Sequence, residues 1–535
     1  MTETLTARPA ALAGPRFTPA ELAALLRLPR PTEEQVRIIS APVVPLLVVA
    51  GAGSGKTETM AARVVWLVAN GYVRPEHVLG LTFTRKAAGE LGHRIRTRLG
   101  QLVRRLGRDE LVTGEPTVAT YHSYAARIVT EHGLRSGFEP SARLLTEAAG
   151  WQLADAAVRG YGGDMSDVDA AVGTVVDAVR RLAAELAEHL RAPEELAAWT
   201  GRFHAQVQGL PGRVYADVRT VLDRQRARLA LLPIVRAYDE RKRALEAMDF
   251  GDQLARAAVV ARDHPEVGAI ERDRFRVVLL DEYQDTSHAQ VVLLRALFGG
   301  GHPVTAVGDP CQSIYGWRGA SAGTLRRFPL DFPPARQAVL STSWRNRPEI
   351  LDVANALSRP LREAGARVAR LVPAARVARP VGSAHTVHCA LLETDADEAG
   401  WVADRIARAW REEAGVEPGT PVAQIPAARR PTTAVLVRTR RQITALDSAL
   451  RSRGLPVEVV GLGGLLDTPE VRDVVATMQV LADPAQGAAL LRLLTGPRWR
   501  IGPRDLVALH RRAKALARER AGEREREAVV DRLDE

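Results

Sequence analysis

The run Leu46-Leu47-Val48-Val49-Ala50-Gly51-Ala52-Gly53-Ser54-Gly55-Lys56-Thr57 passes from four apolar residues into a glycine-rich turn that ends in Lys-Thr. This pattern predicts a buried strand, a phosphate-binding loop and a helix over 58–69. Glycines let successive backbone N–H groups turn toward phosphate oxygens, and a helix N-terminus adds its positive dipole end. We therefore expect Ala50 through Thr57 to bind a nucleotide, with Lys56 between the β- and γ-phosphates and Thr57 on Mg²⁺.

Lysine usage supports this interpretation. Lys56 is one of only four lysines, with Lys86, Lys242 and Lys514, among 74 basic residues. A compact ammonium on a flexible stem suits a site between two phosphates better than a planar guanidinium does. Ala50 departs from the usual pattern, which begins with glycine. The alternative is a glycine-rich strand–helix turn that binds no nucleotide.

Bulk composition sets wider limits. At 535 residues the chain is long enough for about three or four domains. A net charge of +11 suits a polyanionic partner, although an arginine-rich composition can also reflect coding bias. Two cysteines, Cys311 and Cys389, exclude a disulfide framework and a four-cysteine metal site. No apolar stretch approaches the roughly 20 residues of a membrane span, so we expect a cytoplasmic protein without membrane contact.

A second segment, Val277-Val278-Leu279-Leu280-Asp281-Glu282, runs from an apolar strand into two carboxylates. A P-loop site needs such an acidic pair. Asp281 is expected to meet Mg²⁺, and Glu282 to polarise the attacking water. The alternative is a strand that ends in a solvated acidic turn.

A third segment, Gly308-Asp309-Pro310-Cys311-Gln312-Ser313-Ile314-Tyr315-Gly316-Trp317-Arg318, follows another apolar strand. It offers a glutamine, two aromatic rings and an arginine within seven residues. This combination predicts a nucleotide-sensing group beside a platform on which bases stack.

Together the three segments resemble the UvrD/Rep/PcrA family of superfamily 1 DNA helicases, and in particular the AdnB-type motor of a bacterial helicase–nuclease. The resemblance implies an α/β P-loop NTPase fold with two RecA-like parallel-sheet lobes and helical insertion subdomains. It implies an ATP-dependent 3′–5′ helicase or translocase on single-stranded DNA and duplex junctions, in DNA repair or recombination. It also implies the cofactors ATP and Mg²⁺, and a second helicase–nuclease subunit as a partner.

The resemblance assigns roles to further residues. In the nucleotide site, Gln35 would read the adenine, Trp344 would stack on it, Gln312 would sense the γ-phosphate and Arg345 would act as an arginine finger. The catalytic set is then Lys56, Glu282, Gln312 and Arg345. The DNA-contacting set is Phe83, Thr84, Lys86, His122, Tyr315, Trp317 and Arg318. The alternatives are a capping role for Gln35, a buried Phe83, a structural His122 and a surface salt bridge for Arg345.

One position departs from the family. Glu58 stands where relatives often place an arginine against the adenine, and a carboxylate cannot make that cation–π contact. The sequence therefore predicts a weaker hold on the base.

Organisation along the chain follows from helix signals and spacing. Thr18 and Thr32 begin capping boxes, the first opening a helix to about Leu28. We expect residues 1–120 and 246–342 to form the first lobe, 121–245 a helical insertion, 343–485 a second lobe and 486–535 the start of a second insertion. Apolar residues at helical spacing in the first insertion are Val168, Val172, Val175, Val179, Leu182, Leu186 and Leu190.

The second lobe is expected to be incomplete. Strands at 434–438 and 457–461, around a helix at 444–453, predict a second parallel sheet. The tail, 503–535, is a charged helical stretch, and family motifs that complete this lobe are not found in it. The sequence therefore predicts the N-terminal part of a longer protein or a truncated product. The alternative function is a non-cycling fragment that binds ATP and DNA.

Overall fold

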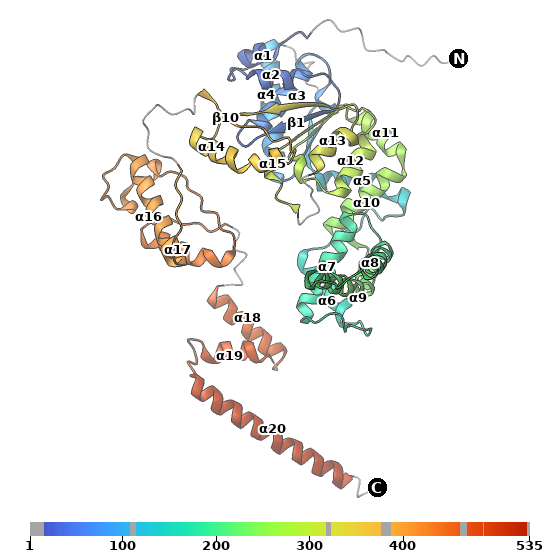
Figure 1. The fold of residues 1–535 in the computed structure, drawn as a ribbon, viewed down its shortest axis with the longest axis vertical. Coiled ribbons are helices and arrows are strands. Elements are labelled where there is room, and N and C mark those ends of the chain that lie inside the picture. The colour runs from blue at the N-terminus through green and yellow to red at the C-terminus, as the bar shows by residue number, and fades with distance from the viewer. Residues whose placement is uncertain are drawn as a thin grey trace. The chain divides into compact units, whose positions relative to one another are not determined.

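The computed structural model describes residues 15–107, 114–316, 323–375, 387–460, 468–484 and 486–531 (Figure 1). It divides into two compact units, residues 1–387 and 388–535. Within the described ranges, no helix is both long and apolar enough to cross a membrane.

A six-stranded parallel sheet forms the centre of the first unit, in the order β3-β2-β6-β7-β1-β8. Its strands are β1 (Leu46–Ala50), β2 (Val78–Thr82), β3 (Thr117–Thr120), β6 (Val277–Leu280), β7 (Val304–Gly308) and β8 (Arg336–Leu340). The four central strands, β2, β6, β7 and β1, are buried along their whole length. Continuous apolar runs are typical of parallel strands that are covered on both faces.

Alternating side chains of the strands divide the core into two layers. Val48, Val277 and Leu279 pack on one face with α1 (Pro19–Leu25), α2 (Glu33–Ile39), α3 (Lys56–Ala69) and α4 (Arg85–Leu106). Val278 and Leu280 pack on the other face with α5 (Tyr121–His132), α10 (Phe250–Asp263), α11 (Pro265–Arg274), α12 (His288–Phe298) and α13 (Thr324–Asp331). The period-2 alternation of strand side chains therefore supplies both layers.

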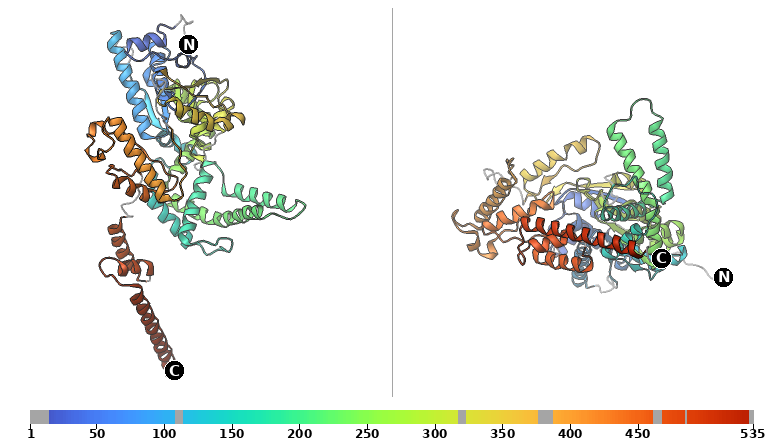
Figure 2. Two further views of the ribbon diagram at one scale, coloured as in Figure 1. Left: turned by 60° about the vertical axis from the view of Figure 1, so that its left-hand side comes forward. Right: turned by 90° about the horizontal axis from the view of Figure 1, so that it is seen from below.

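The predicted helical insertion contains α6 (Glu147–Arg159), α7 (Val172–Glu188), α8 (Pro193–Gln208) and α9 (Ala216–Ala244), and projects from the sheet (Figure 2). Its two ends are joined by a short parallel ladder between β4 (Arg143–Leu144) and β5 (Ala247–Met248). The predicted core stripe is confirmed at four α7 positions, Val175, Val179, Leu182 and Leu186. It is wrong at Val172, which is 43% exposed at the first residue of the helix.

Both predicted capping boxes are confirmed, at Thr18 with Glu21 and at Thr32 with Gln35. The first helix, α1, ends at Leu25, earlier than expected.

The described residues of the second unit form helices and no strand ladder. Its helices are α16 (Asp395–Ala414), α17 (Ile443–Ser452), α18 (Pro469–Ala482), α19 (Gly487–Thr495) and α20 (Pro503–Asp531). The helix predicted at 444–453 is confirmed as α17.

The strands predicted at 434–438 and 457–461 are wrong for the described residues, which pair in no ladder there; residue 461 lies outside them. Leu436 is 94% and Val460 87% exposed, so these apolar residues are not buried as in a covered sheet. A strand needs a neighbour to satisfy its backbone groups, and neither segment has one among the described residues.

A buried arginine joins α2 to α3 and the sheet. Arg63 donates from Nη1 to the carbonyls of Ile38 (2.9 Å), Ile39 (3.2 Å) and Ala41 (2.8 Å), and from Nη2 to that of Pro42 (3.0 Å). Its Nε donates to Thr305 on β7 at 3.3 Å. Burial lowers the pKa of Arg63 to about 10, so the group stays charged at neutral pH.

We expect Arg63→Ala to lower the free energy of unfolding by at least about 3 kcal/mol, since it leaves several buried carbonyls without a charged donor. Denaturant unfolding followed by circular dichroism measures this. Arg37→Ala, which removes an exposed arginine from α2, is the matched control and should change stability by less than about 0.5 kcal/mol. Equal stability of the two variants would contradict this role for Arg63.

Candidate functional site

The predicted site residues follow the carboxyl ends of the six parallel strands. The P-loop follows β1, Phe83 follows β2, and Asp281 and Glu282 follow β6. His122 lies just after β3, Gln312 after β7, and Trp344 and Arg345 after β8. Parallel strands all end at one edge of a sheet, where ligands of open α/β sheets bind. The topology therefore brings segments far apart in sequence to one edge.

The P-loop has the backbone geometry that its glycines predict. Gly53 and Gly55 have φ of 72° and 80°, in the left-handed region that favours glycine. A Cβ at Gly53 would lie 2.8 Å from the Cβ of Arg345, so no side chain fits there. Ser54 Oγ donates to the Gly51 carbonyl at 2.7 Å and closes the turn. Lys56 and Thr57 then open α3.

The lysine and the acidic pair meet as predicted. Lys56 Nζ lies 3.0 Å from Glu282 Oε2. Glu282 has a φ of 50°, a strained conformation for a residue with a side chain, and such strain clusters at functional sites. Asp281 is buried, and this burial, with the neighbouring charge of Glu282, raises its pKa to about 6. Both carboxylates therefore lie beside the P-loop cation.

Gln284 extends this contact into the third motif. Its Nε2 donates to Glu282 Oε2 at 2.8 Å, while its Oε1 accepts from the Asp309 backbone N–H at 3.0 Å. Gln312 Nε2 in turn donates to Asp309 Oδ2 at 2.8 Å. An unbroken chain of polar contacts thus runs from Lys56 to Gln312, and we call it the Lys56–Gln312 chain.

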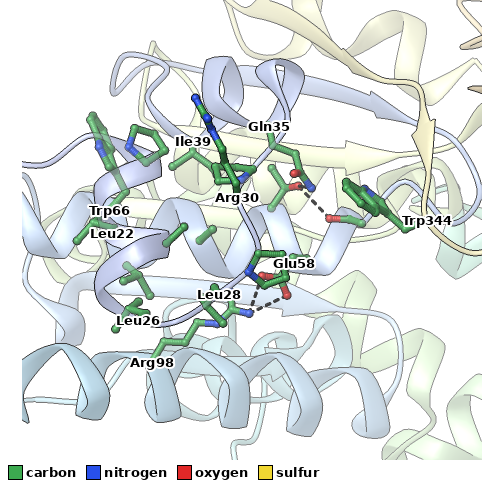
Figure 3. A pocket seen from close by; sticks show the side chains of 18 residues that line it. Leu22, Leu26, Leu28, Arg30, Gln35, Ile39, Glu58, Trp66, Arg98 and Trp344 are labelled. Carbon is green, nitrogen blue, oxygen red and sulfur yellow. Dashed lines mark hydrogen bonds and ion pairs between the residues drawn. The ribbon is translucent and has the colours of Figure 1, made fainter. Parts of the chain in front are cut away.

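The predicted base-binding residues Gln35 and Trp344 line one cavity together with Glu58, close to Gly55 of the P-loop (Figure 3). A Cβ at Gly55 would lie 3.2 Å from Gln35 Nε2 and 3.8 Å from both Glu58 Cβ and Trp344 Cδ1. A cavity of about 440 Å³ opens among Gln35, Glu58 and Trp344 and extends along apolar side chains of α1 and α3. Gln35 caps its helix and also faces this cavity, so the capping alternative and the base-reading role coexist.

Backbone contacts hold Trp344 and Arg345 against the P-loop. The Trp344 N–H donates to the Gly53 carbonyl at 2.8 Å. The Glu34 carboxylate accepts from the Ser341 N–H at 2.9 Å, so α2 anchors the segment that precedes the tryptophan. The Arg345 side chain is exposed and forms no ion pair with a described residue, which disfavours the salt-bridge alternative.

Among the predicted DNA-contacting residues, the rings of Phe83 and Tyr315 stack with centroids 5.1 Å apart. Phe83 is half-buried and also packs on the core. His122 lies edge-on to Phe250, with centroids 5.8 Å apart. Phe83, His122 and Phe250 line a groove of about 1000 Å³ between the sheet edge and the insertion.

Thr84 and Lys86, which are also predicted to contact DNA, lie at the turn from β2 into α4. Thr84 Oγ1 caps α4 by accepting from the Ala87 N–H at 3.1 Å. The Lys86 side chain is 88% exposed. Trp317 and Arg318 lie outside the described residues.

Sequence reasoning missed three groups. Gln284 stands two residues after Glu282, and its place in the acidic motif was a usable signal. Tyr121 OH donates to the Asp281 carbonyl at 3.1 Å, which ties α5 to the acidic pair. Arg98 pairs with Glu58 from another helix, and no local pattern marks it.

Two family models match this chain. The model of the UvrD/REP helicase N-terminal domain matches residues 31–333, and that of the UvrD-like helicase C-terminal domain matches residues 338–518. The expectation that the C-terminal motifs are missing is therefore wrong at the level of the domain, and the truncated, non-cycling alternative has no support.

Curated relatives agree. The chain is 31% identical to the ATP-dependent DNA helicase UvrD1 of Mycobacterium tuberculosis over 476 residues, 86% of this chain and 53% of that protein. It is 28% identical to DNA helicase II of Escherichia coli over 89% of this chain and 57% of that protein. It is 27% identical to the ATP-dependent DNA helicase PcrA of Leuconostoc citreum, over 88% of this chain and 55% of that protein.

The chain spans about half the length of the curated relatives it matches. These relatives give no support to a second helicase–nuclease subunit. The fold is that of a RecA-like P-loop NTPase, as the sequence predicts. This follows from the two family matches together with the P-loop and the parallel sheet. This chain belongs to the UvrD/REP helicase family.

Proposed function

We propose that this chain is an ATP-dependent DNA helicase or translocase that couples ATP hydrolysis to 3′–5′ movement on single-stranded DNA, in DNA repair or recombination. The observation that carries the proposal is the Lys56–Gln312 chain. It begins in the phosphate-binding loop and ends three residues before Tyr315, whose ring stacks on Phe83. The single-strand site is the groove lined by Phe83 and His122.

The proposed hydrolytic step gives a role to each charged group of the site. Water attacks the γ-phosphorus, the bond to the β–γ bridging oxygen breaks, and Glu282 takes the proton of the water. Lys56 stabilises the negative charge on the β- and γ-phosphates, and Arg345 adds a second cation. The Lys56–Glu282 contact at 3.0 Å supports this assignment, because it brings the proposed base close to the proposed phosphate-binding cation.

A divalent cation fits the remaining donor set. Asp281 is a buried carboxylate beside the P-loop, and Thr57 offers a hydroxyl at the start of α3. Carboxylate and hydroxyl oxygens are ligands that suit Mg²⁺. When bound, Mg²⁺ would neutralise charge on the β- and γ-phosphate oxygens. Asp281 and Thr57 would hold it, Asp281 directly or through water.

Coupling between the two ligands would run through Gln312 and Gln284. Gln312 is proposed to sense the γ-phosphate. Its side-chain amide donates a hydrogen bond to the Asp309 carboxylate, and the Asp309 backbone N–H donates one to the Gln284 side chain. A change at the γ-phosphate would therefore shift the loop that carries Tyr315. Stacked bases tolerate any sequence because every base has a π-face, which suits a translocase.

Substitutions at Lys56 and Glu282 test the proposed site. Lys56→Ala should abolish ATP binding and hydrolysis. Glu282→Gln should keep ATP binding and lower turnover at least about 100-fold, because only water activation is lost. The measurements are steady-state hydrolysis with and without single-stranded DNA, and unwinding of a duplex with a 3′ tail. Lys514→Ala, an exposed lysine of α20, is the control. A folded Glu282→Gln protein that fails to bind a non-hydrolysable ATP analogue would contradict these roles.

The raised pKa of Asp281 predicts a pH dependence. A metal ligand must be deprotonated, so Mg²⁺-dependent nucleotide affinity should fall as the pH drops through about 6. Fluorescent-nucleotide titrations between pH 5 and 8 measure this. The phosphates of the nucleotide titrate in the same pH range. The Asp281→Asn variant is therefore the control, since it lacks the carboxylate and leaves the titration of the phosphates unchanged. The variant should bind weakly at every pH and show a shallower profile. Parallel profiles for the two proteins would contradict the role of Asp281.

Removal of a stacking ring should weaken DNA binding. We expect Phe83→Ala to reduce affinity for single-stranded DNA by about 1–3 kcal/mol, with little dependence on base sequence. Fluorescence anisotropy at several salt concentrations measures this, and affinity should fall steeply with salt. Trp151→Ala, a partly exposed ring on α6 outside the groove, is the matched control and should bind normally. Normal DNA binding by a folded Phe83→Ala protein would leave Phe83 as a packing residue only.

A further inference from the structure

A buried guanidinium lies at the base end of the nucleotide cavity. Arg98, on α4, is 7% exposed. Its Nη2 lies 2.5 Å from Glu58 Oε1 and 2.7 Å from Glu58 Oε2. Glu58 also accepts from Arg94 Nη1 at 3.2 Å. Two arginines thus share one carboxylate, and the group keeps a net charge of about +1.

Arg98 has hydrogen-bonding capacity left over. Its Nη1 is buried and has no hydrogen-bond partner among the described residues. A buried polar group without a partner is costly, and a charged donor more so. A ligand that offers an acceptor or a π-face to this guanidinium would recover that cost.

The cavity places that ligand beside the P-loop. Arg98 and Glu58 line the same cavity as Gln35 and Trp344, whereas Arg94 does not line it (Figure 3). Glu58 is in the first turn of α3, next to the loop that would hold the phosphates. A group attached to those phosphates through a ribose would therefore reach the wall formed by Glu58 and Arg98.

We propose that Arg98, oriented by Glu58, is a nucleotide-base-binding residue and forms the wall of the base site that faces Trp344. This deepens the proposed function and rests on it. A planar guanidinium stacks on nucleobases and can donate to a ring nitrogen or exocyclic oxygen. Glu58 itself cannot make a cation–π contact with the base, but it pairs with Arg98 of α4, and the Arg98 guanidinium supplies that cation. The ligand class is a nucleoside triphosphate, recognised through its base and not only through its phosphates.

The experiment compares a ligand with a base to one without. Binding of Mg-ATP and of Mg-tripolyphosphate to the full chain is measured by calorimetry. Arg98→Ala should weaken ATP binding about three- to thirtyfold, the range of a cation–π contact from exposed to desolvated. Tripolyphosphate binding should change less than about twofold. Arg98→Lys, which keeps the charge and loses the planar group, should recover only part of the ATP affinity.

Arg94→Ala is the matched control, since it removes the other partner of Glu58 without altering the cavity lining. It should bind both ligands within about twofold of the unmodified chain. Normal ATP binding by Arg98→Ala, an equal loss in Arg94→Ala, or an equal loss of tripolyphosphate would each overturn the inference.

Two further measurements cover the cases in which Arg98→Ala does not fold or the unmodified chain binds no ligand. If Arg98→Ala does not fold, the double variant Glu58→Gln with Arg98→Met removes both charges at similar volume and should show the same ATP-specific loss. Unchanged ATP affinity in that variant would overturn the inference. If the unmodified chain binds neither ATP nor tripolyphosphate, the proposed ATP site itself fails, which is a different result from an Arg98 variant that binds normally.

Discussion

The parallel register of β1, β6 and β7 is the constraint on which the site depends. Leu280, the last residue of β6, pairs with Ala306 of β7, and Ala306 pairs with Leu47 of β1. Strand β6 therefore ends two residues before β7 and three before β1, which sets the acidic pair back from the P-loop. All three strands are buried along their whole length. Strands β6 and β7 are followed directly by Asp281 and Asp309, and β1 by the glycine-rich P-loop. Burial of the strands therefore fixes how far the P-loop lies from the acidic pair. A slip by one residue would turn buried side chains to the opposite face, and packing on both faces opposes such a slip.

Strand order then separates the two proposed ligand sites. Strands β3 and β2, at one end of the sheet, lead to His122 and Phe83, while β1 and β8, at the other end, lead to the P-loop and Trp344. Strands β6 and β7 lie between them and carry the Lys56–Gln312 chain. Gly308 is needed at the end of β7, because a Cβ there would lie 2.6 Å from Gln284 Oε1. The polar connection between the two ends thus depends on one close approach of side chain and backbone.

The sequence predicted what short segments specify. The P-loop, the acidic pair Asp281-Glu282 and the two capping boxes are encoded in runs of a few residues whose chemistry allows few alternatives. Strand propensity failed at 434–438 and 457–460, since an apolar run becomes a strand only where a neighbour pairs with it. Arg98 could not be predicted, because its contact with Glu58 joins two helices 40 residues apart and no local pattern distinguishes it from other arginines of α4. The domain boundaries and the individual roles of the site residues stay predictions.

Helix α4 gives the site a second connection beside the Lys56–Gln312 chain. It begins at the turn that carries Phe83 and Thr84, and Arg98 follows on the same helix, about 21 Å from Thr84 at 1.5 Å per residue. Its buried face, which includes Leu91, Ile95 and Leu99, packs in the same core layer as α3. A packed helix moves as one body, so the ion pair between Glu58 and Arg98 ties the turn that carries Phe83 to the first turn of α3. The proposed nucleotide and DNA sites of this unit are therefore joined twice, through the sheet edge by β6 and β7 and through the helical layer by α4.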